Sequence, residues 1–313
     1  MFYDLKGITL HADVYTKHGY CRIKRRQILF VPKGVHFYCA NTGMYSQSYF
    51  IHKNYPTIMK ENTIEDFNFK LICEYFSLIP RQGPGNEQTT LKALSFINDN
   101  FDETSRIIDI GCGTGMQTIT LAQNINGNIE AIDLFPRFIE MLNKRLEQMN
   151  LQNRCKAIVG DMTKLQIQEE SADLIWSEGA IYNIGFKKGL HKWRRFLKRG
   201  GYIAVSEAIW FTEQRPKEVE DFWKVYPEID TMGNKIKQME NEGYETVAVF
   251  RIPDCCWTTS FYAPQKKARE IIMRKYPQNE CVQNLVNCMK HEEGIFNRYH
   301  KYYGYAFFIG RKL

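Results

Sequence analysis

The chain has 313 residues, of which 44% are hydrophobic and 25% are charged. This composition is that of an ordinary globular protein with enough apolar residues for one large domain or two smaller ones, and it argues against extensive disorder. No uncharged apolar run reaches the roughly 18 residues that a membrane-spanning helix needs. The opening Met-Phe-Tyr-Asp-Leu-Lys contains no apolar stretch, so we expect a cytoplasmic protein without a secretory signal or a membrane span.

The net charge of +7 is concentrated in one segment. Residues 1–58 contain eight Lys or Arg residues and only two Asp residues, whereas the remainder is almost balanced. A nearly neutral body provides no electrostatic field that would attract phosphate backbones. We therefore expect no nucleic-acid partner, despite the basic total.

The nine cysteines do not form a metal-binding pattern. No Cys-x-x-Cys pair occurs, and Cys255 and Cys256 are adjacent, which is a poor spacing for zinc ligands. Scattered reduced thiols in a cytosolic protein explain the count, and no metal site is expected.

Residues 1–58 form a basic N-terminal extension that differs in kind from the rest of the chain. They hold four of the seven histidines and lack clear helical periodicity. Two interpretations remain open: a small accessory region, or an extension of the gene model that is not a real domain, with Met59 as the true start. We favour the second, which places the main domain at residues 59–313.

From residue 67 onward the pattern alternates between helices and strands. Helices are predicted at about 67–77 and 87–98, joined by the turn-forming Arg81-Gln82-Gly83-Pro84-Gly85 loop. Strands are predicted at residues 106–110, 128–133, 155–159, 172–176, 201–206, 246–252 and 303–310. Further helices are predicted at residues 117–123, 136–149 and 190–197. This alternation predicts an α/β fold with a doubly wound, mostly parallel sheet.

Residues 207–245 interrupt the alternation. They contain several aromatic residues in a helical setting and are too long for a simple crossover, so we expect a helical, aromatic cap inserted over one end of the sheet. A helical stretch at about 264–293 separates the last two strands.

The most informative motif is a glycine-rich turn at the end of the first strand. Gly111, Gly113 and Gly115 follow an apolar strand and precede a helix, an arrangement that lets a ligand approach the backbone and the helix N-terminus. The dinucleotide fingerprint needs glycines at relative positions 0, 2 and 5, but here they occupy 0, 2 and 4, and Met116 follows. Asp109 lies two residues before the first glycine.

This D-x-G-x-G-x-G pattern resembles motif I of the class I S-adenosylmethionine-dependent methyltransferases. The resemblance covers residues 65–313 and implies a Rossmann-like sheet of seven strands in the order 3-2-1-4-5-7-6, with the seventh strand antiparallel. It implies S-adenosyl-L-methionine as the cofactor and S-adenosyl-L-homocysteine as the product. Leu197-Lys198-Arg199-Gly200-Gly201 is similar to the family's turn before strand five, with Arg199 in place of proline.

Cofactor-binding residues are expected at the ends of the first four strands. Asp133, followed by Leu134, ends the second strand, and a carboxylate at that point can accept both ribose hydroxyls. In the family, the acid matching Asp161 contacts the adenine amino group and the neighbour matching Met162 packs on the ring. Asp109 and Gly111, Gly113 and Gly115 complete this set, although Asp109 could instead hold the turn by hydrogen bonds.

The loop before the second predicted helix points to a particular group within this family. Arg81-Gln82-Gly83-Pro84-Gly85 together with the cap is similar to a bacterial group of small-molecule methyltransferases related to the quinone-biosynthesis enzymes. On this basis Gln82 and Gly83 are expected to cover the methionine end of the cofactor, and the acceptor is expected to be a small molecule. Most members of the group are known by their fold alone, so the resemblance does not name the acceptor.

No residue can be assigned as catalytic from the sequence. Methyl transfer is an in-line displacement with a good leaving group, so orientation and a dry site can supply most of the catalysis. Glu178 and Tyr182, which follow the fourth strand, are the candidates. Glu178 could contact the cofactor, act as a base or cap the next helix, and Tyr182 could orient the substrate or line the rim.

Other classes of function remain open at this stage. A nicotinamide-dependent oxidoreductase is disfavoured by Met116, which occupies the position of that fingerprint's third Gly or Ala, and by Asp161. A non-catalytic protein that binds an adenosyl ligand is compatible with every motif. An RNA methyltransferase is disfavoured by the charge distribution. The sequence does not settle the oligomeric state, and a homodimer remains open.

Overall fold

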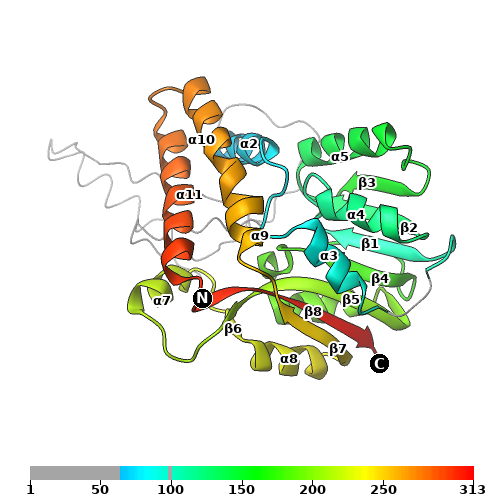
Figure 1. Ribbon diagram of the computed structural model, residues 1–313. Helices are drawn as coiled ribbons and strands as arrows, with labels where there is room; N and C mark the ends of the chain where they lie inside the picture. The colour runs from blue at the N-terminus through cyan, green and yellow to red at the C-terminus, as the bar shows by residue number, and fades with distance from the viewer. Residues whose placement is uncertain (1–63, 98–100) are drawn as a thin grey trace, which may run out of the picture.

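The structure is a computed structural model that describes residues 64–97 and 101–313. The basic extension at 1–58 and the alternative start at Met59 lie outside the described residues, so both interpretations of that segment stay predictions. The described residues form a twisted sheet with helices on both of its faces and a group of helices at one end (Figure 1).

The sheet has eight strands, and its main path runs in the order β3-β2-β1-β4-β5-β8-β7. The strands are β1 (Arg106–Ile110), β2 (Asn128–Asp133), β3 (Cys155–Val159), β4 (Ala172–Ser177), β5 (Leu197–Trp210), β6 (Asp230–Thr231), β7 (Tyr244–Arg251) and β8 (Tyr303–Lys312). Strands β1 to β5 pair in parallel, whereas β8 is antiparallel to both β5 and β7. Apart from the two-residue β6, which pairs with β5, this confirms the predicted order and the antiparallel last long strand.

Helices cover the sheet in two layers. They are α2 (Ile64–Ser77), α3 (Glu87–Leu94), α4 (Met116–Asn124), α5 (Pro136–Gln148), α6 (Phe186–Arg194), α7 (Lys217–Trp223), α8 (Met232–Asn241), α9 (Cys255–Trp257), α10 (Ala263–Lys275) and α11 (Glu280–Tyr299), with short turns η2 (Ile181–Asn183) and η3 (Thr258–Tyr262). Helices α3, α4 and α5 pack into the buried cluster on one face of the sheet, and α6 and α8 pack into the cluster on the other, where α8 is seen in Figure 1.

The central strands are apolar on both faces because helices cover both sides. Side chains alternate along each strand, so Ile107 of β1 and its partner Leu174 of β4 belong to one buried cluster. The next pair, Ile108 and Ile175, belongs to the cluster on the opposite face. The run of branched apolar residues that predicted each strand is therefore explained by this double burial.

Local signals fix where several helices begin. Pro136 is the first residue of α5, where its missing N–H breaks no helical hydrogen bond. The side chains of Asn86, Thr231 and Asn279 each accept a hydrogen bond from a backbone N–H three residues later, at the starts of α3, α8 and α11.

The helices at the end of the sheet come from three parts of the chain. Residues 207–210 of the expected cap insertion belong to β5, and α8 follows β6 and lies against the sheet beside β7. Helix α7 supplies the aromatic part of the insertion and contacts α11. Helix α11 stands beside α7, and α2 lies next to α10 (Figure 1), so the covering layer includes helices before the first strand and between the last two.

A charged pair is buried where β5 extends beyond its predicted end at residue 206. Glu207 and Lys235 are both fully buried, with 3.3 Å between the ammonium nitrogen of Lys235 and Oε1 of Glu207. Lys235 also lies over the ring of Phe186, 4.6 Å from its centre. A buried ion pair of this kind contributes little net stability, but removing one partner leaves an uncompensated buried charge.

In the described part of the chain, no helix combines the length and the apolar character needed to cross a bilayer. Residues 64–97 and 101–313 also contain no group of three or more potential metal ligands.

Candidate functional site

A cavity lies at the carboxyl ends of β1, β2, β3 and β4, where parallel sheets of this type bind their ligands. Its lining includes Gly111 and Gly113 after β1, Asp133 and Leu134 at the end of β2, Asp161 and Met162 after β3, and Glu178 after β4. Gln82 and Gly83, from the loop before α3, close it on one side. We call this the first cavity.

The glycine-rich turn needs glycine for both conformation and space. Gly113 has a φ of +56°, and a Cβ atom there would lie 2.3 Å from Oε1 of Gln82. A Cβ atom on Gly111 would lie 2.4 Å from the Cβ of Ala180. Side chains at either position would therefore fill or distort the first cavity.

Gln82 connects the loop before α3 to this turn. Its Oε1 accepts a hydrogen bond from the backbone N–H of Thr114 at 2.7 Å, and its Nε2 donates to the carbonyl oxygens of Phe76 and Ile79. The amide thus joins α2 to the start of α4, and the residue that was expected to cover the ligand also sets the position of the loop.

Asp133 is tied to the backbone on one side and borders the first cavity on the other. Its Oδ2 accepts from the N–H of Gly113 at 2.9 Å, and its Oδ1 accepts from the N–H of Phe135 at 3.0 Å. Burial raises the pKa of Asp133 to about 6, so the carboxylate is ionised at neutral pH. A carboxylate has about four acceptor positions, so two remain for a ligand diol.

The segment after β3 is shaped by a similar turn. Oδ1 of Asp161 accepts hydrogen bonds from the backbone N–H of Thr163 at 2.8 Å and from its hydroxyl at 2.7 Å. Neither contact uses the second carboxylate oxygen. Met162 lies beside the glycine turn, because its Cε would be 3.4 Å from a Cβ atom on Gly111.

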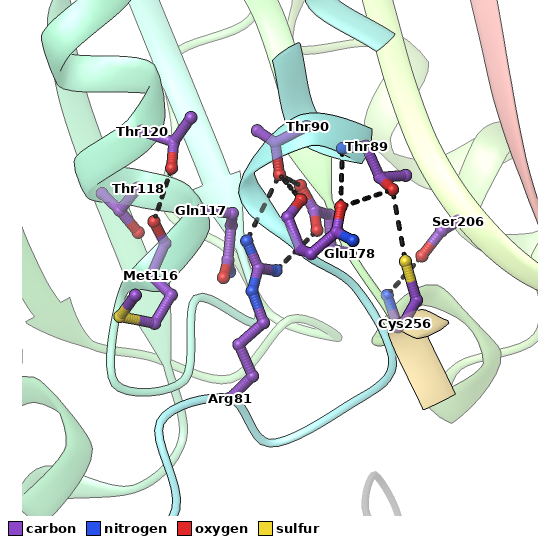
Figure 2. Close-up of polar contacts among 12 residues, drawn as sticks. Arg81, Thr89, Thr90, Met116, Gln117, Thr118, Thr120, Glu178, Ser206 and Cys256 are labelled. Carbon is purple, nitrogen blue, oxygen red and sulfur yellow. Dashed lines mark hydrogen bonds and ion pairs between the residues drawn. The ribbon is translucent and has the colours of Figure 1, made fainter. Parts of the chain in front are cut away.

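Glu178 is held by three side-chain donors, two of which, Arg81 and Thr90, are labelled in Figure 2. Arg81 donates to Oε2 at 2.8 Å, while Thr90 and Trp176 donate to Oε1 at 2.6 and 3.0 Å. Arg81 and Glu178 form an ion pair whose side chains are only 8% and 3% exposed. Residue 179, immediately after Glu178, is held through its N–H by the hydroxyl of Ser206. Because both oxygens of Glu178 accept hydrogen bonds, its carboxylate connects the side chains of Arg81, Thr90 and Trp176 beside the first cavity.

Two of the expected cofactor residues do not line the first cavity. Asp109 is fully buried, and its Oδ2 accepts a hydrogen bond from the hydroxyl of Thr118, which fits the alternative that it holds the turn. Burial raises the pKa of Asp109 to about 7. Gly115 immediately precedes α4, and a Cβ atom there would collide with Leu142.

A second cavity adjoins the first beneath the covering helices. The two share Phe76, Gln82, Gly83, Pro84, Gly179 and Tyr182. Burial raises the pKa of the Tyr182 hydroxyl above its usual range, so this group stays protonated at neutral pH.

The rest of the second cavity comes from residues that the sequence analysis did not select. It is lined by aromatic residues of α7, α9, η3 and β8, together with Glu292 of α11. The aromatic residues are Phe222, Trp223, Trp257, Phe261, Tyr303 and Tyr305. The aromatic cap expected at residues 207–245 includes only Phe222 and Trp223 of this set. Arg81, which lines the first cavity, stands next to the predicted Gln82 and was also not selected.

Comparison with known proteins agrees with this geometry. Residues 107–201 match a family described as a methyltransferase domain. Sterol 4-C-methyltransferase of Caenorhabditis elegans is 27% identical over 111 residues, which are 34% of this chain and 32% of that enzyme. Demethylmenaquinone methyltransferase of Lactobacillus johnsonii is 26% identical over 128 residues, 38% of this chain and 51% of that enzyme. The alignments thus span only about a third to a half of these relatives.

The fold extends further than the sequence matches. A methyltransferase from Geobacter sulfurreducens, solved with S-adenosyl-L-homocysteine, superimposes with a TM-score of 0.68 at 19% identity, over 78% of this chain and 98% of that one. The strand order, with the glycine turn after β1 and acidic residues at the ends of β2 and β3, defines a Rossmann-like fold. Residues 107–201 thus match a methyltransferase domain, and the fold around them is that of solved S-adenosylmethionine-dependent methyltransferases.

Proposed function

We propose that the protein transfers the methyl group of S-adenosyl-L-methionine to a small-molecule acceptor that binds in the second cavity. The observation that carries this proposal is the junction of the two cavities at Gly83, Gly179 and Tyr182. A ligand held in the first cavity can present a group at that junction to a molecule in the second.

The residues of the first cavity suit the parts of the adenosyl ligand. Two free acceptor positions on Asp133 match the two ribose hydroxyls, and the second oxygen of Asp161 matches an amino group on the adenine ring. Met162 supplies an apolar surface for the ring. Arg81 is the cation that faces the remaining side of the cavity and suits the methionine carboxylate.

The chain's contribution to the reaction is then orientation and exclusion of water. When bound, the sulfonium supplies an electrophilic methyl carbon and a good leaving group. The covering helices keep the second cavity apolar, which favours an in-line approach of the acceptor. We propose that Glu178 positions the site through Arg81 and that Tyr182, which stays protonated, orients the acceptor.

Calorimetric titration of the purified full chain tests this function. We expect S-adenosyl-L-methionine and S-adenosyl-L-homocysteine to bind with micromolar affinity and NAD not to bind. Transfer of a tritiated methyl group to a small-molecule extract should follow. Binding of NAD in preference to the adenosyl ligands would favour an oxidoreductase, and tight binding without transfer to any extract would favour a binding protein without catalysis.

A further inference from the structure

The second cavity has an unusual charge balance. Among the residues that the structure describes, thirteen line the cavity, eight of them are aromatic, and Glu292 is the one with a formal charge. None of these thirteen is a Lys, Arg or His residue. An acceptor that carries a carboxylate or a phosphate would therefore meet a carboxylate and aromatic faces, with no cation to compensate its charge.

Glu292 has few partners within the protein. Its Oε1 accepts a hydrogen bond from the hydroxyl of Tyr262 at 3.1 Å. Within residues 69–97 and 101–313, no ion pair involving Glu292 is formed. The neighbouring Glu293 instead pairs with Arg269 at 2.7 Å, which leaves that cation engaged outside the cavity. Glu292 is thus a cavity carboxyl group that lacks a counter-ion among the described residues.

The aromatic residues around it form a continuous group. The ring centres of Trp257 and Tyr305 are 4.8 Å apart, and those of Trp223 and Tyr303 are 5.1 Å apart, both edge to face. Trp257 and Tyr303 themselves are in edge contact at 6.2 Å. Aromatic faces attract organic cations, most strongly when water is excluded, as it is from these buried rings.

Two polar atoms of the same lining are buried without a hydrogen-bond partner in the described part of the chain. They are Nε1 of Trp257 and the hydroxyl of Tyr303. Buried polar groups are normally paired, so such atoms in a cavity wall are suited to a polar substituent on a bound molecule. The apolar lining and these two groups together fit an acceptor with a ring or chain that bears a neutral polar group.

We propose that the methyl acceptor is an organic amine with an apolar body and no anionic group, bound as its ammonium ion between Glu292 and the aromatic faces of the second cavity. This proposal rests on the proposed function, because the amine must meet the methyl donor at the junction of the cavities. A phenol or a carboxylic acid is not favoured, since neither offers the positive charge that this lining can stabilise.

The reaction balances without a further reactant. The ammonium ion transfers one proton to the carboxylate of Glu292, which leaves a neutral amine with a free electron pair. That pair forms the new bond from nitrogen to the methyl carbon, while the carbon–sulfur bond breaks and its electrons return to sulfur. The products are the methylated ammonium ion, neutral S-adenosyl-L-homocysteine and protonated Glu292, which then releases its proton to water.

The environment of Glu292 is compatible with this exchange of a proton. Burial raises the pKa of its carboxyl group to about 7. The titratable groups that interact with it from the neighbouring elements are tyrosine hydroxyls, those of Tyr75 on α2, Tyr182 on η2, Tyr262 on η3 and Tyr303 and Tyr305 on β8. All five hydroxyls are protonated at neutral pH because burial raises the pKa of each.

Binding to the full chain saturated with S-adenosyl-L-homocysteine tests the proposal. Three matched probes share a phenethyl body and differ only in the terminal group, which is positive, neutral or negative: phenethylammonium, phenethyl alcohol and 3-phenylpropionate. Tryptophan fluorescence reports binding, since Trp223 and Trp257 line the cavity. We expect the ammonium probe to bind about tenfold or more tightly than the alcohol, and the carboxylate to bind weakest. Benzylamine extends the series of amines.

Two variants assign the effect to one carboxyl group. Glu292→Gln keeps the shape and the acceptor for Tyr262, and it should abolish the preference for the ammonium probe while leaving S-adenosyl-L-homocysteine binding unchanged. Glu293→Gln makes the same change one residue along, outside the cavity, and should preserve the preference.

The results separate the two proposals. If S-adenosyl-L-homocysteine fails to bind the folded wild-type chain, the proposed function fails. If it binds but the carboxylate matches the ammonium, no amine binds at millimolar concentration, or Glu292→Gln retains the preference, the amine proposal alone is overturned.

Discussion

Replacing Asp133 with alanine should weaken adenosyl binding by a predictable amount. The wild-type carboxylate spends two acceptor positions on the N–H groups of Gly113 and Phe135 and has about two left for the ribose. Loss of hydrogen bonds to a charged acceptor costs about 1.5–3 kcal/mol. At about 1.4 kcal/mol for each tenfold change, Kd should rise by a factor of about 10–150.

The same substitution also removes two contacts inside the turn, so stability must be measured in parallel. Each lost backbone contact should lower the free energy of unfolding by about 1 kcal/mol, because water can replace the partner of a half-buried group. Urea denaturation measures this loss, and calorimetry under conditions where each variant is folded measures the affinity for S-adenosyl-L-homocysteine.

Asp102 provides a matched control. Its Oδ1 accepts from the N–H groups of Thr104 and Ser105 in an exposed turn before β1, at the end of the strand away from the first cavity. Asp102→Ala should therefore lower stability by a similar amount and leave the affinity unchanged. If folded Asp133→Ala binds the ligand within about twofold of the wild type, our placement of the ribose is wrong.

Three further predictions concern buried ionisable groups. Arg81→Met strands Glu178 without its cation and should lower the free energy of unfolding by about 3–5 kcal/mol in urea titrations; a loss under about 1 kcal/mol would contradict the ion pair's role. Lys235→Met should cost a similar amount, and adding Glu207→Leu should recover most of it; if the double variant is no more stable than the single one, the buried charge is not the cause. Because the pKa of Asp109 is raised to about 7, the folded protein binds this proton more tightly than the unfolded chain, whose pKa is about 4. Its contribution to stability is therefore fully present below about pH 4 and is lost as the pH rises through about 7. Asp133 and Glu292, whose pKa values are raised to about 6 and about 7, add to the same slope, so Asp109→Asn should reduce the slope of unfolding free energy against pH without abolishing it; an unchanged slope would show that Asp109 does not titrate there.

Local sequence patterns were sufficient to predict the long strands and the edge of the sheet at which the candidate site residues gather. Each predicted strand was a short apolar run, and double burial explains why such runs become central strands. The glycine turn follows β1, Asp133 is the last residue of β2, and Asp161 lies just after β3. Parallel pairing of these strands therefore brings all of these residues to one edge of the sheet. Their roles toward a ligand stay predictions.

Where sequence reasoning fell short, the cause was contact between distant segments. Helix α6 begins at Phe186, earlier than predicted, and it includes Gly189, where a Cβ atom would collide with Ile181. The glycine there is thus explained by a tertiary contact and does not mark a helix boundary. Strand β5 continues past residue 206 because the charge of Glu207 is compensated by Lys235 from another element. Glu292 gives no local signal, since only tertiary packing of α11 brings it to the second cavity.

The position of β8 imposes an order on how the sheet can assemble. This strand lies between β5 and β7, although it follows both along the chain. During synthesis, β1 to β5 can pair while β8 is still inside the ribosome, and β7 must wait for its neighbour. Pairings between such distant segments are slow to form because a long loop must close first. Since Tyr303 and Tyr305 belong to β8, a nascent chain can complete the first cavity before the second exists.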